Sequence, residues 1–410
     1  MAARRRVWRF VLPPVAATAS CAAFAAFHYR PDPTDELIAN QGPLSRRFKS
    51  STNLSDQATE PEPLLLRLGR GLVLGSVGIA SRVFLYALNS TEVEKNERHS
   101  RLVELVRHRP HGQPLLTVAN HTSTLDDPAL PATLAPWDVL LFKPSKMRWS
   151  ICSQEICFEN AALATFFGAG KVLPIKRGGG VDQKLLLDFA RRLAAGDWCH
   201  IFPEGATVQT GSLGGRADPL AVARSGRLKW GVGKLIAHAP TLPMVVPIHH
   251  TGMQDVVAEH PRTKDVLPSQ PTTGNAVTIR VGPEVSVFDL IEDHERRHGR
   301  LRKYGTSPAL DDAAWEPMWQ STLEERALYG AITRRVEAAL EALEREAKEK
   351  LGDHYPTIPK VVSSGRWRAL VGEEEGEEEE GVVSAAEGEV GGGDGGSHGE
   401  QHKHKHRRPK

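Results

Sequence analysis

Short apolar runs alternate with helical patterns through the middle of the chain. Five runs have the length and composition of strands: residues 115–119, 172–175, 200–202, 244–248 and 277–281. Between them, Leu185, Phe189 and Leu193 recur at four-residue spacing, as on one face of a helix, and Val232 and Ile236 do the same. Strands that alternate with helices predict an α/β fold, with a mostly parallel or mixed sheet flanked by helices in a single domain.

The N-terminal 63 residues lack this alternation. Residues 1–30 carry five arginines and no acidic residue around an alanine-rich apolar stretch, a composition typical of a mitochondrial targeting leader. A signal anchor or a disordered leader has a similar composition and remains an alternative. Residues 31–63 hold five prolines among polar residues, which predicts a linker.

Residues 64–88 form an apolar stretch that contains several glycines. Arg67, Arg70 and Arg82 interrupt it. The uncharged part, residues 71–81, is too short to cross a bilayer, which needs about 20 apolar residues. A membrane-interfacial helix with its arginines at headgroup level fits this pattern better, and a helix buried in the core is the alternative.

The folded domain is predicted to span residues 89–350. Residues 91–109 are charged and favour a helix with one apolar side, and residues 321–350 predict one long charged helix. Residues 351–410 contain an acidic block, several glycines and a basic end rich in histidine, so we expect a disordered low-complexity tail. The histidines could bind metal adventitiously, but disorder accounts for the composition.

Charge and cysteine content exclude some classes of function. The formal charge of +2 over 410 residues gives no broad basic field for nucleic acid. The cysteines include no Cys-x-x-Cys pair and are too few for a disulfide framework. We therefore expect a reduced, structural role for all four: Cys21, Cys152, Cys157 and Cys199.

The candidate chemistry centres on His121, which follows the predicted strand 115–119 and precedes Asp126 by five residues. A histidine works best as a general base near neutral pH when a carboxylate fixes its tautomer and stabilises its charged form. Pro128 biases Asp127 away from helical backbone and suits the first turn of a helix. The sequence therefore predicts a turn in which Asp126 folds back onto the imidazole.

Further polar residues follow the ends of the other predicted strands. They are Lys176 and Arg177, then Phe202, Pro203, Glu204 and Gly205, and then His249 and His250. In open α/β sheets, ligands bind beyond the carboxyl ends of the strands. These residues are therefore predicted to share one site with His121.

The residue types suggest different uses within that site. Arg177, followed by three glycines, suits a phosphate group, and Arg227 and Lys229 are weaker candidates of the same kind. A solvated surface position is the alternative for Arg177. Glu204, between a proline and a glycine, could bind a substrate hydroxyl or hold its own loop through backbone amides.

Two readings of the remaining polar residues stay open. His249 and His250 name no chemistry by themselves and are expected to be structural or to lie at the rim. A metal site is a less favoured alternative, because the local spacing matches no common zinc or calcium pattern. Its ligands would be His121, Asp126, Asp127 and Glu204.

Two motifs together resemble one enzyme family. The pattern Asn-His-x-x-x-x-Asp at residues 120–126, followed by Phe-Pro-Glu-Gly at residues 202–205, is similar to the glycerophospholipid acyltransferase superfamily. Further segments narrow the resemblance to one branch of it: residues 126–128, 156–158, 170–174, 196–205, 227–236 and 250–256. The resemblance covers about residues 64–290 and leaves out the leader and the tail.

The resemblance implies an α/β acyltransferase domain with a helical part near the membrane. The reaction would move a fatty acyl chain onto the free hydroxyl of a lysophospholipid. In this branch the donor is another phospholipid, no coenzyme A or other cofactor is needed, and cardiolipin is the main product pool. The location would be a mitochondrial membrane, inner or outer, facing the intermembrane space. The alternatives are an acyl-CoA-dependent or N-acylphosphatidylethanolamine-forming enzyme, and a binding protein without activity.

The resemblance also assigns roles to residues. His121 would be the general base and Asp126 its orienting partner, which leaves Asp127 as a helix cap. Substrate would be bound by Glu204, Gly205, Arg177, Phe202, Pro203 and Lys229. Two departures fall on the lipid-binding side, namely Ala206 where a lysine is usual and a long segment at residues 207–225, and they put the headgroup preference in question.

Overall fold

The structure of the chain is a computed structural model that describes residues 64–209, 226–261, 263, 265–304, 319–356 and 358–372. The predicted leader and linker, Cys21, residues 210–225 of the long segment and residues 373–410 of the tail lie outside this part. The statements below about hydrogen bonds, ion pairs and exposure refer to the described residues.

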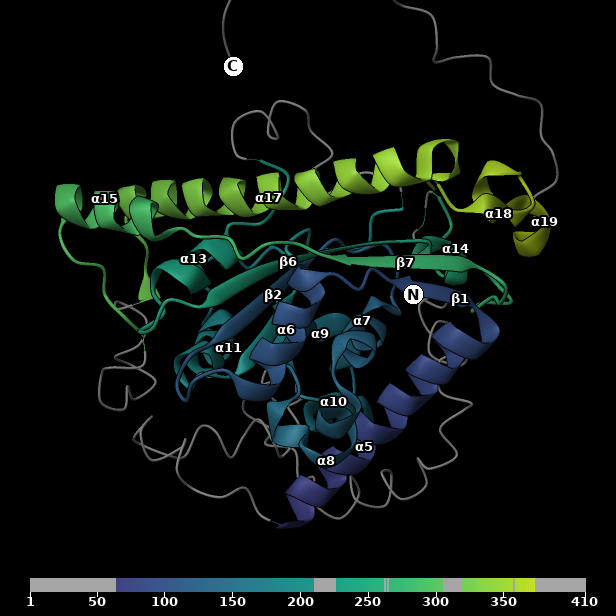
Figure 1. The fold of residues 1–410 in the computed structure, drawn as a ribbon, viewed down its shortest axis with the longest axis horizontal. Coiled ribbons are helices and arrows are strands. Elements are labelled where there is room, and N and C mark those ends of the chain that lie inside the picture. The colour runs from purple at the N-terminus through teal and green to yellow at the C-terminus, as the bar shows by residue number, and fades with distance from the viewer. Residues whose placement is uncertain are drawn as a thin grey trace, which may run out of the picture. The chain divides into compact units, whose positions relative to one another are not determined.

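A five-stranded sheet forms the centre, in the order β1-β7-β6-β2-β5 (Figure 1). Its strands are β1 Ser90–Val93, β2 Leu115–Ala119, β5 Trp198–Ile201, β6 Met244–Thr251 and β7 Ala276–Val281. Strands β6, β2 and β5 are parallel to one another, β7 is antiparallel to β6, and β1 is parallel to β7. The predicted α/β fold with a mixed, mostly parallel sheet is confirmed.

A second, two-stranded sheet pairs β3 Ser150–Ser153 with β4 Val172–Ile175 in parallel. It continues from β5 through a single bridge, in which the Trp149 amide donates to the Trp198 carbonyl at 2.8 Å and the His200 amide donates to the Trp149 carbonyl at 2.7 Å. The predicted strand 172–175 is therefore present, but it lies outside the central sheet. The sequence missed β3 because Ser-Ile-Cys-Ser carries no continuous apolar run.

Helices cover both faces of the central sheet. The longer ones are α5 Leu64–Val83, α6 Glu97–His108, α7 Asp126–Leu134, α10 Ala161–Ala169, α11 Lys184–Ala194, α15 Phe288–His298 and α17 Leu323–Leu351. The shorter ones are η3 Phe84–Leu88, α8 Trp137–Phe142, η4 Pro144–Lys146, α9 Gln154–Cys157, α13 Gly231–Ala237, α14 Met253–Val256, η5 Gly352–His354, α18 Lys360–Ser363 and α19 Trp367–Val371. One apolar core joins the sheet to α11, α13 and α17, and the other joins it to α5, α6, α7 and α8.

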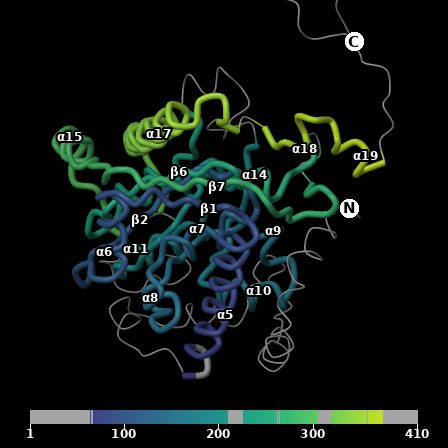
Figure 2. The backbone as a smooth tube through the Cα atoms, turned by 45° about the vertical axis from the view of Figure 1, so that its right-hand side comes forward, coloured from purple at the N-terminus to yellow at the C-terminus, as the bar shows by residue number. Residues whose placement is uncertain are grey.

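The long helix α17 crosses one face of the sheet, as Figures 1 and 2 show. Its first residue follows a capping box, in which the Glu325 amide donates to the Thr322 hydroxyl and the Thr322 amide donates to the Glu325 carboxylate. Ile332, Val336 and Leu340 recur every four residues and are fully buried. The predicted helix at 321–350 is confirmed, and its apolar stripe packs on the sheet.

Residues 64–88 are helical throughout, as α5 and the π-helical turn η3. The segment Arg67–Leu88 is long and apolar enough to cross a membrane by length and composition, and 33% of its most apolar window is buried inside the protein. It packs beside α7, α8 and α10, on the face of the sheet opposite α17 (Figure 2). One side of α5 is thus covered by the domain and the other is open, which suits a helix that lies on a membrane surface.

Two predicted boundaries differ from the structure. Residues 90–93 form the polar edge strand β1 instead of the start of a helix, and α6 begins only at Glu97, behind the Asn96 side chain that accepts from the His99 amide. Residues 360–371 of the predicted tail form α18 and α19. Trp367 is buried there, with its ring 4.7 Å from that of His260. Val361 and Val362 pack in the same apolar cluster, and the Lys360 amide donates to Asp255 at 2.7 Å, contacts that composition alone did not reveal.

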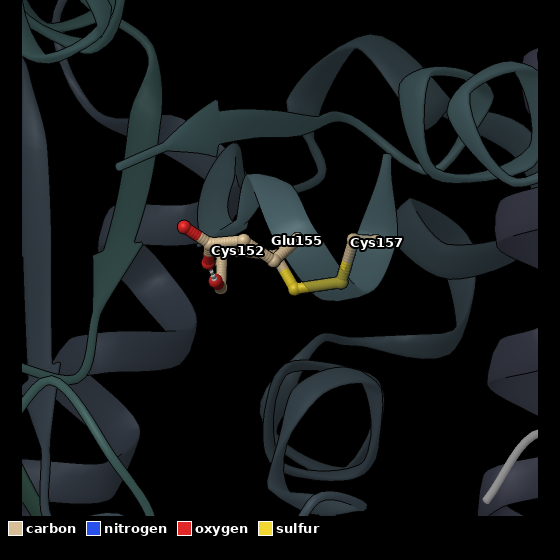
Figure 3. The surroundings of a disulfide bond; sticks show 4 residues. Cys152, Glu155 and Cys157 are labelled. Atoms are coloured by element: carbon tan, nitrogen blue, oxygen red, sulfur yellow. Dashed lines mark hydrogen bonds between the residues drawn. A yellow bond between two sulfur atoms is a disulfide. The ribbon is translucent and has the colours of Figure 1, made fainter. Parts of the chain in front are cut away.

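The expectation of reduced cysteines is wrong for two of the four. Cys152 at the end of β3 and Cys157 at the end of α9 form a disulfide across five residues, with their Cα atoms 6.0 Å apart (Figure 3). The short helix α9 turns the chain back so that the two side chains meet, a geometry that the spacing does not disclose. Cys199 in β5 is free and buried, as expected.

Candidate active site

The catalytic candidate His121 lies just beyond the carboxyl end of β2, the buried central strand. Asp127 has φ −108° and ψ 108°, the extended backbone expected before Pro128, and this breaks the helix directly after Asp126. Asp126 therefore points back, and its Oδ2 lies 2.9 Å from Nδ1 of His121. The predicted turn and its pairing of histidine with carboxylate are both present.

The Asp126 carboxylate is fixed by backbone as well as by histidine. Its Oδ2 accepts from the amides of Thr122 at 2.7 Å and Ser123 at 2.9 Å, and its side chain is fully buried. Burial alone raises the pKa of this carboxyl, but attraction to His250 and hydrogen bonding from His121 outweigh it, so the pKa lies well below its ordinary value. Asp126 is therefore held as a carboxylate at neutral pH.

The carboxylate determines the tautomer of His121. An ionised carboxylate can only accept, so Nδ1 of His121 carries the hydrogen and Nε2 keeps its lone pair. No described residue makes a hydrogen bond to that Nε2, and the side chain is 21% exposed. The imidazole therefore presents a basic nitrogen to solvent from an otherwise buried turn.

His250 is a site residue that the sequence placed among structural or peripheral ones. Its Nε2 donates to the Asn120 carbonyl at 2.9 Å and lies 3.4 Å from Asp126 Oδ2. The Asn120 side chain in turn bonds both the amide and the carbonyl of His250, each at 3.0 Å. The register could have revealed this, because Ala119 pairs with Ile248, which sets residue 250 beside residue 121.

Glu204 and Phe202 bring the second motif onto the first. Glu204 Oε1 accepts from the His121 amide at 3.2 Å, and the Glu204 side chain is 2% exposed. The ring of Phe202 stacks on the His121 imidazole, with centroids 4.3 Å apart and 22° between the planes. The two motifs, about 80 residues apart in the sequence, thus form one site because β2 and β5 are neighbouring parallel strands.

Gly205, Pro203 and Lys229 complete this side of the site. Gly205 has φ +75°, a conformation that favours glycine, and a Cβ there would lie 3.4 Å from the Lys229 side chain. The Lys229 amide donates to the Pro203 carbonyl at 2.8 Å. The Phe-Pro-Glu-Gly turn is therefore packed against Lys229. Of the six predicted substrate-binding residues, Glu204 and Phe202 contact His121, and Pro203, Gly205 and Lys229 belong to the same turn or pack on it.

Arg177 is the one predicted substrate-binding residue that the structure does not place near the His121 turn. It follows β4 in the small sheet, is exposed, and makes no hydrogen bond or ion pair with another described residue. Arg227, the weaker candidate, approaches Glu341 of α17 at 3.9 Å, and its amide donates to Glu337. The prediction that all strand ends share one site therefore holds for β2 and β5, and for β6 through His250.

Two other polar residues have structural partners. Asp127 has the extended backbone of a residue that precedes a helix, but its side chain pairs with Arg148 and no hydrogen bond from it to a helix amide is found among the described residues, so the predicted side-chain cap is not seen. His249 lies on the opposite side of β6 from His250, is 2% exposed, and has a pKa lowered to about 3 chiefly by burial. Within the described part of the chain no three His, Cys, Asp or Glu side chains gather as a metal site would require, and the four suggested ligands do not converge.

Gln209 is a further residue that the sequence did not single out. Its Nε2 donates to the carbonyls of Thr122 and Val257, each at 2.8 Å, and its Oε1 accepts from the Glu259 amide at 2.9 Å. The neighbouring Val208 amide donates to the His121 carbonyl at 2.7 Å. The segment that follows the Phe-Pro-Glu-Gly motif therefore fastens the histidine turn to the chain beyond β6.

Comparison with known proteins agrees with this geometry. Residues 100–251, which contain both motifs and His250, match the family described as Acyltransferase. Over 284 residues the chain is 32% identical to an N-acylphosphatidylethanolamine synthase of Arabidopsis thaliana, covering 68% of this chain and 93% of that protein. The chain belongs to the glycerophospholipid acyltransferase superfamily. The branch that the sequence pointed to is that of the tafazzins.

The tafazzin resemblance is confirmed by two further relatives. The chain is 37% identical over 225 residues to a tafazzin of Drosophila melanogaster, and 35% identical over 190 residues to a taffazin of Dictyostelium discoideum. The aligned stretches span 53% and 58% of those proteins, so the chain matches little more than half the length of each.

Proposed function

We propose that this protein is a membrane-bound transacylase that moves a fatty acyl chain from a phospholipid to the free hydroxyl of a lysophospholipid, without coenzyme A. The observation that carries the proposal is the His121–Asp126 pair, whose imidazole turns an open Nε2 outward beside Glu204. This arrangement suits a general base for a hydroxyl. No activated serine or cysteine lies at the turn, so a direct transfer accounts for the reaction.

The transfer follows from the site geometry. His121 Nε2 takes the proton of the acceptor hydroxyl as its oxygen attacks the ester carbonyl carbon of the donor. The tetrahedral intermediate collapses by breaking the bond to the donor's glycerol oxygen, and the imidazolium returns its proton to that oxygen. Asp126 stabilises the imidazolium through the 2.9 Å hydrogen bond to Nδ1. The base is thereby regenerated in each turnover.

The residues around His121 supply the lipid contacts in this proposal. Glu204 and Gly205 bind the glycerol backbone next to the imidazole, and Phe202 and Pro203 form the wall behind it. Lys229 packs on Gly205 and offers a cation to the headgroup. Arg177, which is exposed at the end of β4, offers its guanidinium to a more distant phosphate of the same lipid.

Cardiolipin is the acceptor and product class that we propose. The tafazzin relatives and the arginine-rich leader at residues 1–30 support a mitochondrial membrane, on the side that faces the intermembrane space. A cardiolipin carries two phosphates. In this proposal Lys229, beside the Phe-Pro-Glu-Gly turn, faces one phosphate, and Arg177, which lies apart from the site at the end of β4, faces the other. Protein partners are left open.

A second candidate function rests on one observation, the match to the Arabidopsis N-acylphosphatidylethanolamine synthase over 93% of its length. In that case the acceptor is the amine of phosphatidylethanolamine, and the same His121 would take the proton from nitrogen. A third variant keeps the hydroxyl acceptor and takes the acyl group from acyl-CoA.

One assay separates these possibilities. Purified protein receives labelled monolysocardiolipin or labelled phosphatidylethanolamine, with either a diacyl phosphatidylcholine or acyl-CoA as the donor. We expect label in cardiolipin only with the phospholipid donor, and loss of this transfer in His121→Ala. Transfer that requires acyl-CoA, or acylation only at the amine, would contradict the proposal. Undiminished transfer by His121→Ala would contradict the role of the histidine.

A further inference from the structure

The exposed apolar side chains of the protein are concentrated on two neighbouring helices. Fifteen large apolar side chains are exposed among the described residues, and ten of these lie on α5–η3 and α8. Those on α5–η3 are Leu64, Leu68, Leu72, Ile79, Val83, Tyr86 and Leu88, and those on α8 are Trp137, Leu141 and Phe142. Such a concentration on a folded domain marks a contact surface.

Helix α8 is built to present apolar residues outward. It has six residues, of which Val139 and Leu140 are buried in the core. Trp137 and Leu141 lie four residues apart and share the outer side, 51% and 38% exposed, and Phe142 at the end of the helix is 78% exposed. Much of each of these three side chains is therefore open to solvent in the described part of the chain. One exposed apolar side chain is ordinary on a protein surface, but a group of them on adjoining helices forms a patch that marks a contact.

The two helices are locked together. The Leu140 side chain packs directly on Gly78 of α5. A Cβ at Gly78 would lie only 2.4 Å from a Leu140 methyl group. The Arg82 guanidinium lies 4.0 Å above the Trp137 ring. Both views place α8 directly beside α5 (Figures 1 and 2). The outer side chains of α8 therefore extend the open side of α5 as one surface, which we call the α5–α8 surface.

The charges around the α5–α8 surface fit an anionic lipid. Of the basic residues in segments 64–88 and 136–148, Arg67, Arg82, Lys143 and Lys146 are at least partly exposed, against one acid, Asp138, although the whole chain is nearly neutral. Lys143 follows Phe142 directly, is about half exposed and pairs with Asp138 at 2.9 Å, and Arg67 is exposed among the first leucines of α5. A tryptophan, apolar tips and flanking cations are the composition of a membrane–water interface.

We propose that α8 is a second membrane-inserting element, which enters the headgroup region of an anionic bilayer beside α5 through Trp137, Leu141 and Phe142. The inference rests on the proposed function for its choice of a lipid surface, because a transacylase must reach two lipids that stay in the membrane. The α5–α8 surface lies against α7, the helix that begins with Asp126, so insertion of α8 sets the active site at the bilayer.

The test removes exposed apolar side chains from α8 and, as a control, an exposed aromatic side chain elsewhere on the protein. Full-length protein is mixed with vesicles of phosphatidylcholine containing phosphatidylglycerol, an anionic lipid that is not the proposed acceptor, and the bound fraction is measured by flotation. We expect Leu141→Ser with Phe142→Ser to lower the partition coefficient by about 10- to 100-fold. Phe288→Ser on α15, whose aromatic side chain is 61% exposed and remote from α5, serves as the control and should bind like the wild type.

A second measurement reports insertion directly. Phosphatidylcholine brominated on its acyl chains should quench tryptophan fluorescence in the wild type and much less in Trp137→Phe. Raising the salt from 50 to 500 mM should weaken binding to anionic vesicles, since screening removes the attraction of the exposed cations. Binding of the double variant like the wild type, or quenching that survives Trp137→Phe, would overturn the proposal. So would a double variant that changes only the oligomeric state in light scattering, because the surface would then join copies of the chain.

Acyl-transfer assays distinguish membrane binding by α8 from the proposed catalytic function. The double variant should retain wild-type turnover on substrates dispersed in detergent micelles, since its changes lie outside the site. If the wild type transfers no acyl chain and vesicle binding still depends on α8, the surface stands and the proposed function fails. If acyl transfer is normal and vesicle binding does not depend on α8, the proposed function is supported and the proposed membrane insertion of α8 is contradicted.

Discussion

A single carboxylate oxygen organises the proposed base. Oδ2 of Asp126 accepts from two backbone amides and from Nδ1 of His121, and His250 lies 3.4 Å away. The amides hold the carboxylate even when the imidazole changes its protonation state. The orientation of His121 is therefore set by the backbone of its own turn, and substrate need not induce it.

Replacing that carboxylate by an amide should impair the chemistry and spare the fold. In Asp126→Asn the introduced carbonyl oxygen can still accept from the Thr122 and Ser123 amides, so the turn should keep its shape. The free energy of unfolding should fall, because the buried charge that lowers the Asp126 pKa also stabilises the fold at neutral pH, but the protein should remain folded. The imidazolium loses its counter-charge, and we expect kcat to fall by about 100- to 10,000-fold with a small change in KM. Steady-state transfer assays and thermal unfolding measure the two effects. Asp188→Asn, at a half-exposed acid on α11, is the control.

At the scale of elements, close packing of α13 against α17 supports the strands that carry the site. Gly233 of α13 faces α17, and a Cβ there would lie 2.2 Å from the Tyr329 carbonyl oxygen. Lys234, the next residue, is wholly buried and donates to Asp182 at 2.6 Å and to the Trp319 carbonyl at 2.5 Å. Helix α13 is thus held to both α17 and the loop before α11, behind the strands that carry the site.

Gly233→Ala tests this packing. The added methyl group must push α17 away from α13, and we expect the free energy of unfolding to drop by about 1 to 3 kcal/mol. Gly231→Ala in the same helix is the matched control, because its Cβ would meet Leu186 at an ordinary 3.6 Å. Denaturant titration compares the two. Equal effects would contradict the proposed close contact.

The disulfide makes a second prediction at this scale. Because Cys152 and Cys157 close a loop of only five residues, their bond restricts the unfolded chain modestly, and Cys152→Ser should cost about 2 kcal/mol of stability. Alkylation of the denatured protein before and after reduction should show two additional thiols after reduction. Cys199→Ser is the control, since its thiol is free in the fold. A protein that shows the same thiol count in both states would refute the bond.

At the scale of the whole molecule, buried histidines link stability to pH. The pKa is lowered to about 4 for His200 and His238 and to about 3 for His249, chiefly because burial disfavours the charged form. The unfolded chain takes up these protons near pH 6.5, where the folded chain does not. The stabilisation is therefore complete above about pH 6.5 and declines as the pH falls toward about 4.

Removing one of these histidines should reduce that slope. His249→Leu eliminates a group that binds no proton in the fold, and the dependence of unfolding free energy on pH should fall by about 1.4 kcal/mol per pH unit between pH 4 and 6. Urea titrations at a series of pH values give the slope for both proteins. Identical slopes would show that His249 does not titrate as its burial requires.

The sequence predicted the parts of this fold that leave periodic or chemical signals. Strand β2, helix α17 and the turn from His121 to Asp126 follow from an apolar run, a helical repeat and a proline. Strand β1 was missed because an edge strand of polar residues leaves no such signal. His121 was predicted as the partner of Asp126. The other neighbours, His250 beside Asp126 and Arg148 beside Asp127, leave no local signal, because they are brought there by the pairing of β2 with β6 and by the chain that enters the second sheet.

The Arg82 side chain links two functions that are otherwise separate. Its guanidinium donates to the carbonyls of Ala132 at 2.8 Å and Thr133 at 3.3 Å, at the end of the helix that begins with Asp126. The same group lies over Trp137. With α8 at the headgroups, these contacts fix how high His121 stands above the bilayer. His121 would then lie at a fixed distance from the bilayer surface. The ester bond of each donor lipid would have to reach that position from its glycerol end, whatever the length of its acyl chain.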